Sequence, residues 1–345
     1  MTVHGYIGLG MMGSAMCERL ARSGAAVLAH DLNPAAVDAA VERGATAAGS
    51  TEEVAEQADI ISTCVPAAAH LDAVIDELAT VGRAGQILLI HSTVHPDTIR
   101  AAQTRVAAWE GLVFDAAVAG GDEAARQGEL AVFAGGLTDA PPIVVEVLKI
   151  YGSKVIDAGP IGSGAALKIA VNVMTYAQFT AAAIAHDGVA NTGGDPTALL
   201  DAWRHTGMLG ALTEQWAGLL AIGPEHVTGE FRTMLETQVG IATKDLELAM
   251  TLGDPAAGPV AVVDAIHALG HPLAAELGGE RLTGGLVGVG DPGEFGAGEI
   301  DDMAGVTRPH APDTDDTDAR HARNSGGSSP SSGPGRGSAA TPRMV

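Results

Sequence analysis

One group of residues near the start of the chain has the types and spacing of a nucleotide-binding turn. It is a G-x-G-x-x-G pattern made of Gly8, Leu9, Gly10, Met11, Met12 and Gly13. The first glycine permits a tight turn, the second lets backbone approach a pyrophosphate, and the third lets a helix pack on a strand. The helix N-terminus then directs unpaired N–H groups at the phosphates. An empty glycine-rich turn is the alternative, but a strand before and a helix after it favour a dinucleotide site.

Asp31 stands at the end of the second expected strand, at the separation typical of the residue that binds the adenosine ribose. A carboxylate there accepts hydrogen bonds from ribose hydroxyls and repels a 2′-phosphate. Residues 32–34 supply no lysine or arginine to offset that repulsion. We therefore expect NAD to be preferred over NADP. The alternative is a solvated turn residue or the cap of the next helix.

Lys168 and Asn172 are four residues apart in an Ala-rich stretch, so on a helix they share a face. A lysine taken partly out of water is suited to proton transfer, and an asparagine can donate and accept hydrogen bonds at once. From the spacing alone, a solvated surface lysine is the favoured alternative. His91 and His95 flank a strand-to-loop turn rather than one helix face, so we expect no metal site.

Short apolar runs alternate with helical segments over the first half of the chain. The expected strands are His4–Gly8, Ala26–Asp31, Asp59–Val65, Gln86–His91, Leu112–Val118, Leu130–Ala134 and Lys154–Ala158. Early helices are expected at Met11–Ser23 and Pro34–Arg43. Runs such as IISTCV and ILLI are typical of parallel strands covered on both faces. This alternation predicts a doubly wound α/β (Rossmann) domain.

The pattern changes after Gly162-Ser163-Gly164, where strand signals largely end. We expect a Rossmann domain over residues 1–161 and an α-helical domain for substrate and oligomerisation over 162–305, joined by a long helix over 162–190. Further helices are expected at Asp195–Trp203, Leu209–Leu220 and Phe231–Leu252. Residues 306–345 are rich in Ser, Gly, Pro and Asp, so we expect a disordered tail.

Composition restricts the partners. The 345 residues carry a net charge of −23, a field that repels nucleic acid and anionic membranes. We expect neither as a partner, and no apolar run reaches the ~20 residues of a membrane helix. MTVHGYIGLG reads as a first strand rather than a signal peptide, and only two cysteines occur. We expect a cytoplasmic protein that acts on a small molecule.

Five segments together resemble the β-hydroxyacid dehydrogenase family (3-hydroxyisobutyrate dehydrogenase-like), in family order over roughly residues 3–250. They are GLGMMGSAM from Gly8, Val65-Pro66 with Ser92-Thr93 and Pro96, DAAVAGG over Asp115–Gly121, Gly162-Ser163-Gly164 with Lys168 and Asn172, and KDLELA over Lys244–Ala249. The resemblance implies a Rossmann domain, a long connecting helix and an all-α second domain. It also implies a homodimer or homotetramer.

The resemblance assigns roles to individual residues. Lys168 would be the general acid/base, and Asn172 would orient the substrate or the lysine. The substrate carboxylate would be held by Ser92, Thr93 and the segment Ala119, Gly120 and Gly121. Val65, Pro66, Thr93 and Lys244 would lie against the cofactor. The implied reaction is hydride transfer between NAD(P) and a short-chain β-hydroxy acid or its semialdehyde, with a 3-hydroxyisobutyrate-like substrate.

The sequence departs from the family pattern at positions that bear on the substrate. Ala119 replaces a serine, which removes a hydroxyl for the carboxylate, although the backbone N–H groups of Gly120 and Gly121 could still bind an anion. Val171 replaces the first asparagine after the lysine, and Glu129 a threonine. Two alternatives stay open: an imine reductase-like enzyme, which the lysine disfavours, and a non-catalytic dinucleotide-binding protein.

Overall fold

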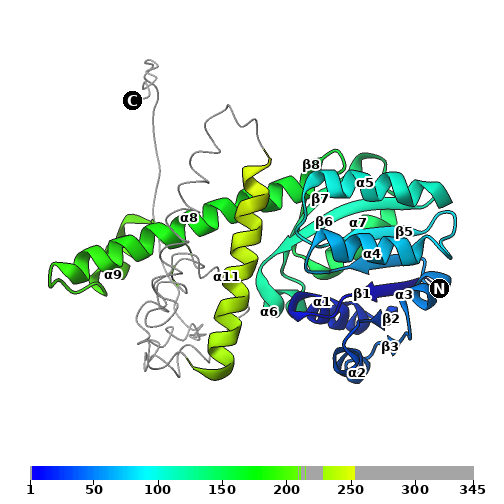
Figure 1. Ribbon diagram of the computed structural model, residues 1–345, viewed down its shortest axis with the longest axis horizontal. Coiled ribbons are helices and arrows are strands. Elements are labelled where there is room, and N and C mark those ends of the chain that lie inside the picture. The colour runs from blue at the N-terminus through cyan, green and yellow to red at the C-terminus, as the bar shows by residue number, and fades with distance from the viewer. Residues whose placement is uncertain (1, 209, 211–213, 215–227, 253–345) are drawn as a thin grey trace, which may run out of the picture. The chain divides into compact units, whose positions relative to one another are not determined.

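The computed structural model describes residues 2–208, 210, 214 and 228–252. Its centre is an eight-stranded sheet with the order β3-β2-β1-β4-β5-β6-β7-β8 (Figure 1). The strands are β1 (Val3–Ile7), β2 (Ala26–His30), β3 (Thr46–Ala47), β4 (Ile60–Thr63), β5 (Ile87–Ile90), β6 (Leu112–Ala119), β7 (Ala131–Gly135) and β8 (Lys154–Gly159). All neighbours pair in parallel except β6 and β7. The expected strands are present, and β3, only two residues long, is the one that the sequence pattern did not predict.

The helices alternate with the strands, which confirms the doubly wound α/β prediction. They are α1 (Met11–Arg22), α2 (Pro34–Glu42), α3 (Thr51–Gln57), α4 (Ala68–Leu78), α5 (Pro96–Val106), α6 (Gly121–Gln127) and α7 (Pro142–Tyr151). Strand β7 runs antiparallel to β6, and the connection between the two strands, residues 120–130, contains only the seven-residue α6.

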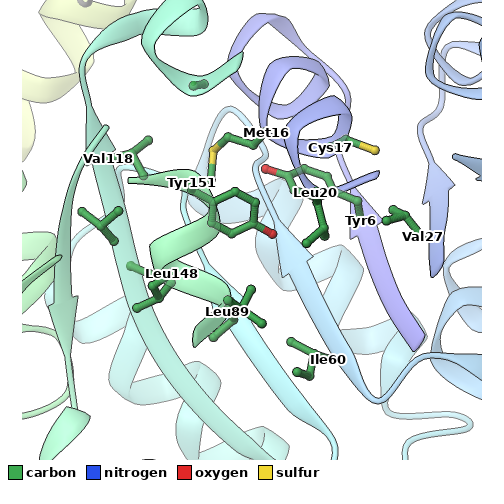
Figure 2. Packing of buried hydrophobic residues seen from close by; sticks show 14 of the residues in the cluster. Tyr6, Met16, Cys17, Leu20, Val27, Ile60, Leu89, Val118, Leu148 and Tyr151 are labelled. Carbon is green, nitrogen blue, oxygen red and sulfur yellow. The ribbon is translucent and has the colours of Figure 1, made fainter. Parts of the chain in front are cut away.

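Alternating side chains bury both faces of the sheet. In β5, Ile87 and Leu89 join one core cluster, while Leu88 and Ile90 join the other. The first cluster packs against α1 and α7, with Met16, Leu20, Leu148 and Tyr151 among its members (Figure 2). The second packs against α3, α4 and α5. Because β5 is covered on both faces, its sequence ILLI is apolar throughout rather than alternating.

Beyond the sheet the described chain is helical. The elements are α8 (Ser163–Asn191), α9 (Ala198–Thr206) and α11 (Gly229–Met250). A third core cluster joins α8 to α11 through residues such as Ile169, Phe179 and Leu246. Helix α9 begins three residues later than predicted because Asp195 accepts hydrogen bonds from the backbone N–H and the hydroxyl of Thr197, which forms a turn there.

Several predictions concern residues that the structure does not describe. The tail over 306–345 and most of the helix expected at Leu209–Leu220 lie outside the described residues. The division at residues 161 and 162 stays a prediction. None of the helices that the structure describes is both long and apolar enough to cross a membrane.

Candidate active site

The glycine-rich turn connects β1 to α1, and each of its glycines has a separate structural reason. Gly8 has a φ of +91°, and a side chain there would overlap the backbone carbonyl of Cys64. A Cβ on Gly13 would overlap the carbonyl of Gly8, so this glycine lets α1 pack closely on the turn. A Cβ on Gly10 would meet no atom within 4 Å. Gly10 therefore leaves space open at the N-terminus of α1, as close approach by a pyrophosphate requires.

Asp31 follows β2 and supports this turn directly. Its Oδ2 accepts a hydrogen bond from the Leu9 N–H at 2.6 Å, and its Oδ1 accepts one from the Asn33 N–H at 2.8 Å. A carboxylate has about four acceptor positions, so it can still accept from ribose hydroxyls. The sequence predicted the ribose contact, but it did not predict that Asp31 also holds the glycine-rich turn in shape.

The turns after β4 and β5 meet at the same edge of the sheet. The N–H of Val65 donates to the Ser92 hydroxyl oxygen at 2.8 Å, and Ser92 is buried. The oxygen of Ser92 is thus engaged in joining the two turns, and its O–H remains able to donate. Strands β1 and β4 lie side by side where the strand order reverses, which is the usual cofactor crevice of an open α/β sheet. Val65, Pro66, Ser92 and Thr93 all follow the carboxyl ends of central strands.

Lys244 connects α11 to that edge. Its Nζ donates a hydrogen bond to the carbonyl oxygen of Thr93 at 2.8 Å. The same Nζ lies 2.8 Å from Oδ1 of Asp245, an ion pair without hydrogen-bond geometry. Lys244 is partly exposed, whereas Asp245 is fully buried. The structure therefore brings Lys244 to the turn that the sequence assigned to cofactor and substrate.

Lys168 and Asn172 lie on one face of α8, and both are largely buried, at 6% and 5% exposure. Asn172 donates from Nδ2 to Oδ2 of Asp245 at 2.6 Å. Among the residues that the structure describes, none hydrogen-bonds to Lys168 or forms an ion pair with it. A lysine that is largely removed from water without an acid beside it is unusual for structural lysines. The solvated-surface alternative is thus inconsistent with its burial.

Asp115, in the middle of β6, determines where α8 begins. Its two carboxylate oxygens accept hydrogen bonds from the N–H groups of Gly162 at 2.8 Å and Ala165 at 2.9 Å. Burial raises the pKa of this carboxyl group, and the backbone N–H groups oppose that shift. Gly162 has a φ of +89°, and a Cβ on Gly164 would overlap the carbonyl of Phe133 in β7. Asp115 and the two glycines thus fix the first turn of α8, and Lys168 follows one turn later.

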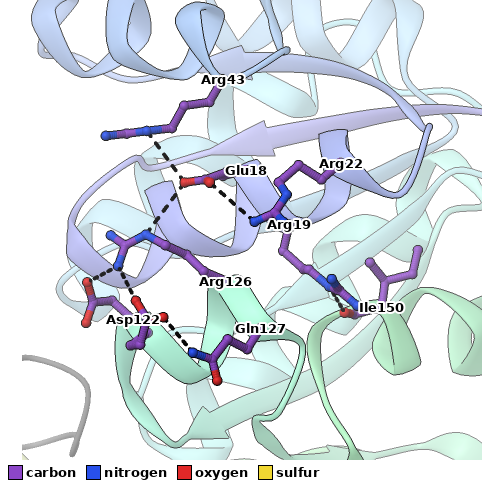
Figure 3. Close-up of polar contacts among 9 residues, drawn as sticks. Glu18, Arg19, Arg22, Arg43, Asp122, Arg126, Gln127 and Ile150 are labelled. Carbon is purple, nitrogen blue, oxygen red and sulfur yellow. Dashed lines mark hydrogen bonds and ion pairs between the residues drawn. The ribbon is translucent and has the colours of Figure 1, made fainter. Parts of the chain in front are cut away.

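Ala119, Gly120 and Gly121 form the turn from β6 into α6. Gly120 and Gly121 have φ values of +137° and +86°, a backbone conformation that favours glycine. An ion pair links α6 to α1: Arg126 lies 3.6 Å from Glu18, and within α6 it also lies 2.6 Å from Asp122 (Figure 3). The expected carboxylate-binding turn is thus tied to the helix that follows the glycine-rich turn.

His91 and His95 have separate roles in the structure. His91 is buried, and its Nδ1 donates to the carbonyl oxygen of Ala116 at 2.8 Å, which leaves Nε2 to accept from the Ser62 hydroxyl at 3.2 Å. Burial lowers the pKa of His91 to about 4. His95 caps α5. Within the described part of the chain, no group of three His, Cys, Asp or Glu residues could hold a metal ion.

Comparison with known proteins shows which proteins this chain resembles. Residues 4–159 match the NAD binding domain of 6-phosphogluconate dehydrogenase. The chain is 37% identical over 290 residues to an uncharacterized oxidoreductase of Mycobacterium tuberculosis, which covers 82% of this chain and 92% of that protein. It is 34% identical over 260 residues to 3-hydroxyisobutyrate dehydrogenase of Pseudomonas aeruginosa, covering 72% and 85% of the two chains.

A solved structure has the same fold. It is 3-hydroxyisobutyrate dehydrogenase of Mycobacterium tuberculosis with L-serine, at a TM-score of 0.70, 22% identity, and coverage of 83% of this chain and 98% of that one. The match to the NAD-binding domain and the extent of the sequence identity to these relatives lead to one conclusion. This chain belongs to the β-hydroxyacid dehydrogenase family of NAD(P)-dependent oxidoreductases.

Proposed function

We propose that this enzyme oxidises a short-chain β-hydroxy acid to its semialdehyde, with Lys168 as the proton acceptor. The observation that carries the proposal is the burial of Lys168 and Asn172 on one face of α8, with no described partner for the lysine. A substrate hydroxyl would provide that partner. A dinucleotide held by the glycine-rich turn and Asp31 would supply the hydride acceptor for the carbinol carbon. Lys168 then holds the hydroxyl proton, and in the reverse direction returns it.

The substrate carboxylate has candidate donors at the neighbouring turns. We propose that it is bound by the Ser92 hydroxyl, by Thr93 and by backbone N–H groups of Gly120 and Gly121. Ala119 offers no hydroxyl, so this enzyme relies more on backbone donors than a serine-containing site would. A 3-hydroxyisobutyrate-like acid is supported by the 3-hydroxyisobutyrate dehydrogenase among the relatives and by the L-serine in the similar structure, since both molecules are short β-hydroxy acids.

NAD is the proposed cofactor in preference to NADP. Asp31 places a carboxylate at the end of β2, and residues 32–36 contain no cation. A 2′-phosphate at this position would meet uncompensated negative charge. Titration with both dinucleotides tests the proposal, and tighter binding of NADP would contradict it.

A homodimer or homotetramer is the proposed assembly. Helix α8 exposes large apolar side chains, including Met174 at 60% and Ile184 at 48%. Exposed apolar groups on a long helix are suited to burial against a second copy. Light scattering at micromolar concentration measures the mass in solution, and a monomer would contradict the proposal.

The decisive test is turnover. Purified protein is screened for NADH formation with short hydroxy acids, with alcohols lacking the carboxylate as controls. Lys168→Ala should lower kcat by about 10²–10⁴-fold, the usual contribution of a general acid/base, while NAD affinity stays unchanged. Lys168→Arg should not restore activity, because a guanidinium stays charged. Turnover of cyclic imines instead of hydroxy acids would favour imine reduction, and no turnover would favour a binding protein.

A further inference from the structure

Asp245 on α11 is a buried acid to which the proposed proton transfer assigns no role. Its side chain is 1% exposed, yet it contacts three polar groups. Oδ2 accepts hydrogen bonds from Nδ2 of Asn172 at 2.6 Å and from the hydroxyl of Tyr176 at 3.2 Å, and Lys244 lies beside Oδ1. Two of these partners are on α8, one turn apart. Asp245 therefore connects the helix that carries Lys168 to the helix that reaches Thr93.

The chemistry of this contact determines which way the Asn172 amide faces. An ionised carboxylate only accepts hydrogen bonds, so Asn172 must present its NH₂ group to Asp245. The carbonyl oxygen Oδ1 is then on the other side of the amide. Among the described residues, none donates to that oxygen. Lys168 is one helical turn earlier on the same face, within the usual range of i,i+4 neighbours.

We propose that Asp245 is a positioning residue that holds the Asn172 carbonyl toward the reacting groups. In this orientation the carbonyl can accept an N–H from Lys168 or the substrate hydroxyl hydrogen. With the amide reversed, the NH₂ group would donate to the lone pair of neutral Lys168. That lone pair must take the substrate proton, so the reversed amide opposes catalysis. The inference rests on the proposed role of Lys168.

The informative variant is Asp245→Asn. An asparagine keeps the size of the side chain but can both donate and accept, so it allows both orientations of Asn172. We expect kcat to fall about ten- to a hundredfold, the size found when groups that orient metal-ligating side chains are removed. NAD affinity should change much less than kcat, because the partners of Asp245 are Asn172, Tyr176 and Lys244 rather than residues of the glycine-rich turn. Glu247→Gln is the matched control: the same acid-to-amide change on α11, at an exposed position, should leave kcat unchanged.

A second measurement does not depend on turnover. The chain contains four asparagines, so protein labelled with ¹⁵N-asparagine gives four side-chain NH₂ signals, and Asn172→Ser assigns one of them. In the native protein that NH₂ pair should be single and protected from solvent exchange. Asp245→Asn adds a fifth signal, from position 245; apart from this, the Asn172 signal should be broadened, doubled or lost in that variant, and in Glu247→Gln it should be unchanged. If no substrate is found, the proposed function fails, and this spectrum still decides the orientation.

A third variant covers the case in which Asp245→Asn does not fold. Combining Asn172→Asp with Asp245→Asn exchanges the two groups and restores one donor and one carboxylate. A carboxylate would then face Lys168 and favour its charged form. The rise of kcat with pH during alcohol oxidation should therefore move to higher pH. The proposal is overturned if folded Asp245→Asn keeps native kcat, if its Asn172 signal is unchanged, or if the exchanged variant turns over with this rise at an unshifted pH.

Discussion

Two alanine substitutions in the same turn should have opposite consequences, because Gly10 and Gly13 are glycines for different reasons. A Cβ on Gly10 meets nothing within 4 Å, and the backbone there has φ −62° and ψ −173°, which alanine adopts without strain. A Cβ on Gly13 would lie 3.0 Å from the carbonyl carbon of Gly8, closer still to its oxygen, and 3.4 Å from the Cβ of Cys64. Gly10→Ala should therefore impair the cofactor site, and Gly13→Ala the fold.

The expected magnitudes follow from these contacts. Gly10→Ala should leave the free energy of unfolding unchanged or raise it by about 0.4–1 kcal/mol through loss of unfolded-state entropy. Its methyl group occupies the space left for the pyrophosphate. Losing one charge-assisted hydrogen bond there costs about 1.5–3 kcal/mol, or about 10- to 150-fold in Kd for NAD. Gly13→Ala forces backbone atoms apart, which costs about 1–3 kcal/mol or more.

Two assays separate the effects. Thermal unfolding without cofactor should give Gly10→Ala a Tm at or above that of the native protein, and Gly13→Ala a Tm lower by roughly 2–4 °C for each kcal/mol lost. Titration with NAD should show that Gly10→Ala loses affinity for NAD without losing stability. If Gly10→Ala binds NAD as tightly as the native protein, the open space at Gly10 is not where the pyrophosphate lies, and this reasoning is wrong.

Three further predictions concern single buried or turn residues. Asp31→Ala should bring the Kd values for NAD and NADP closer together in binding titrations, because the carboxylate that repels a 2′-phosphate is removed. It should also lower Tm, because the N–H groups of Leu9 and Asn33 lose their acceptor. Asp115→Ala should lower the free energy of unfolding by about 2–5 kcal/mol in urea titrations, since two N–H groups at the start of α8 lose their partner; a loss below 1 kcal/mol would contradict the proposed anchoring. Burial lowers the pKa of His91 from 6.5 to about 4, so below pH 6.5 the unfolded chain binds a proton that the folded chain does not. The free energy of unfolding is therefore unaffected by this group above pH 6.5 and falls as the pH drops from 6.5 toward 4. Over that window the free energy of unfolding falls by about 3 kcal/mol. In urea titrations, the free energy of unfolding of His91→Gln should therefore depend less on pH than that of the native protein.

Much of the fold could be predicted from the sequence because its signals are local. The apolar runs of β4 and β5 each fill two core clusters at once, a requirement visible in a few consecutive residues. The glycine-rich turn is likewise contained within six positions. The spacing of Lys168 and Asn172 predicted a shared helix face, and the structure has both on the buried side of α8.

Other features depended on contacts between residues far apart in the chain. Asp115 accepts a hydrogen bond from the N–H of Gly162, 47 residues away, and Asn172 donates one to Asp245, 73 residues away. Hydrogen bonds of this kind leave no periodic mark on the sequence, because either partner alone looks like an ordinary acid or amide. The direction of β7 was also undetermined locally, since a strand pattern is the same in both directions.

The sequence by itself therefore determined the parts: a dinucleotide turn, a sheet covered on both faces, and a lysine and an asparagine on one helix face. Only the tertiary structure decided what surrounds them. In the structure, Asp31 also accepts a hydrogen bond from the glycine-rich turn. Asp115 accepts one from the Gly162 N–H at the start of α8, and Asp245 accepts one from the Asn172 amide. Periodicity records which side of an element is buried, whereas the identity of the atoms across the interface is fixed only when two distant segments pack together.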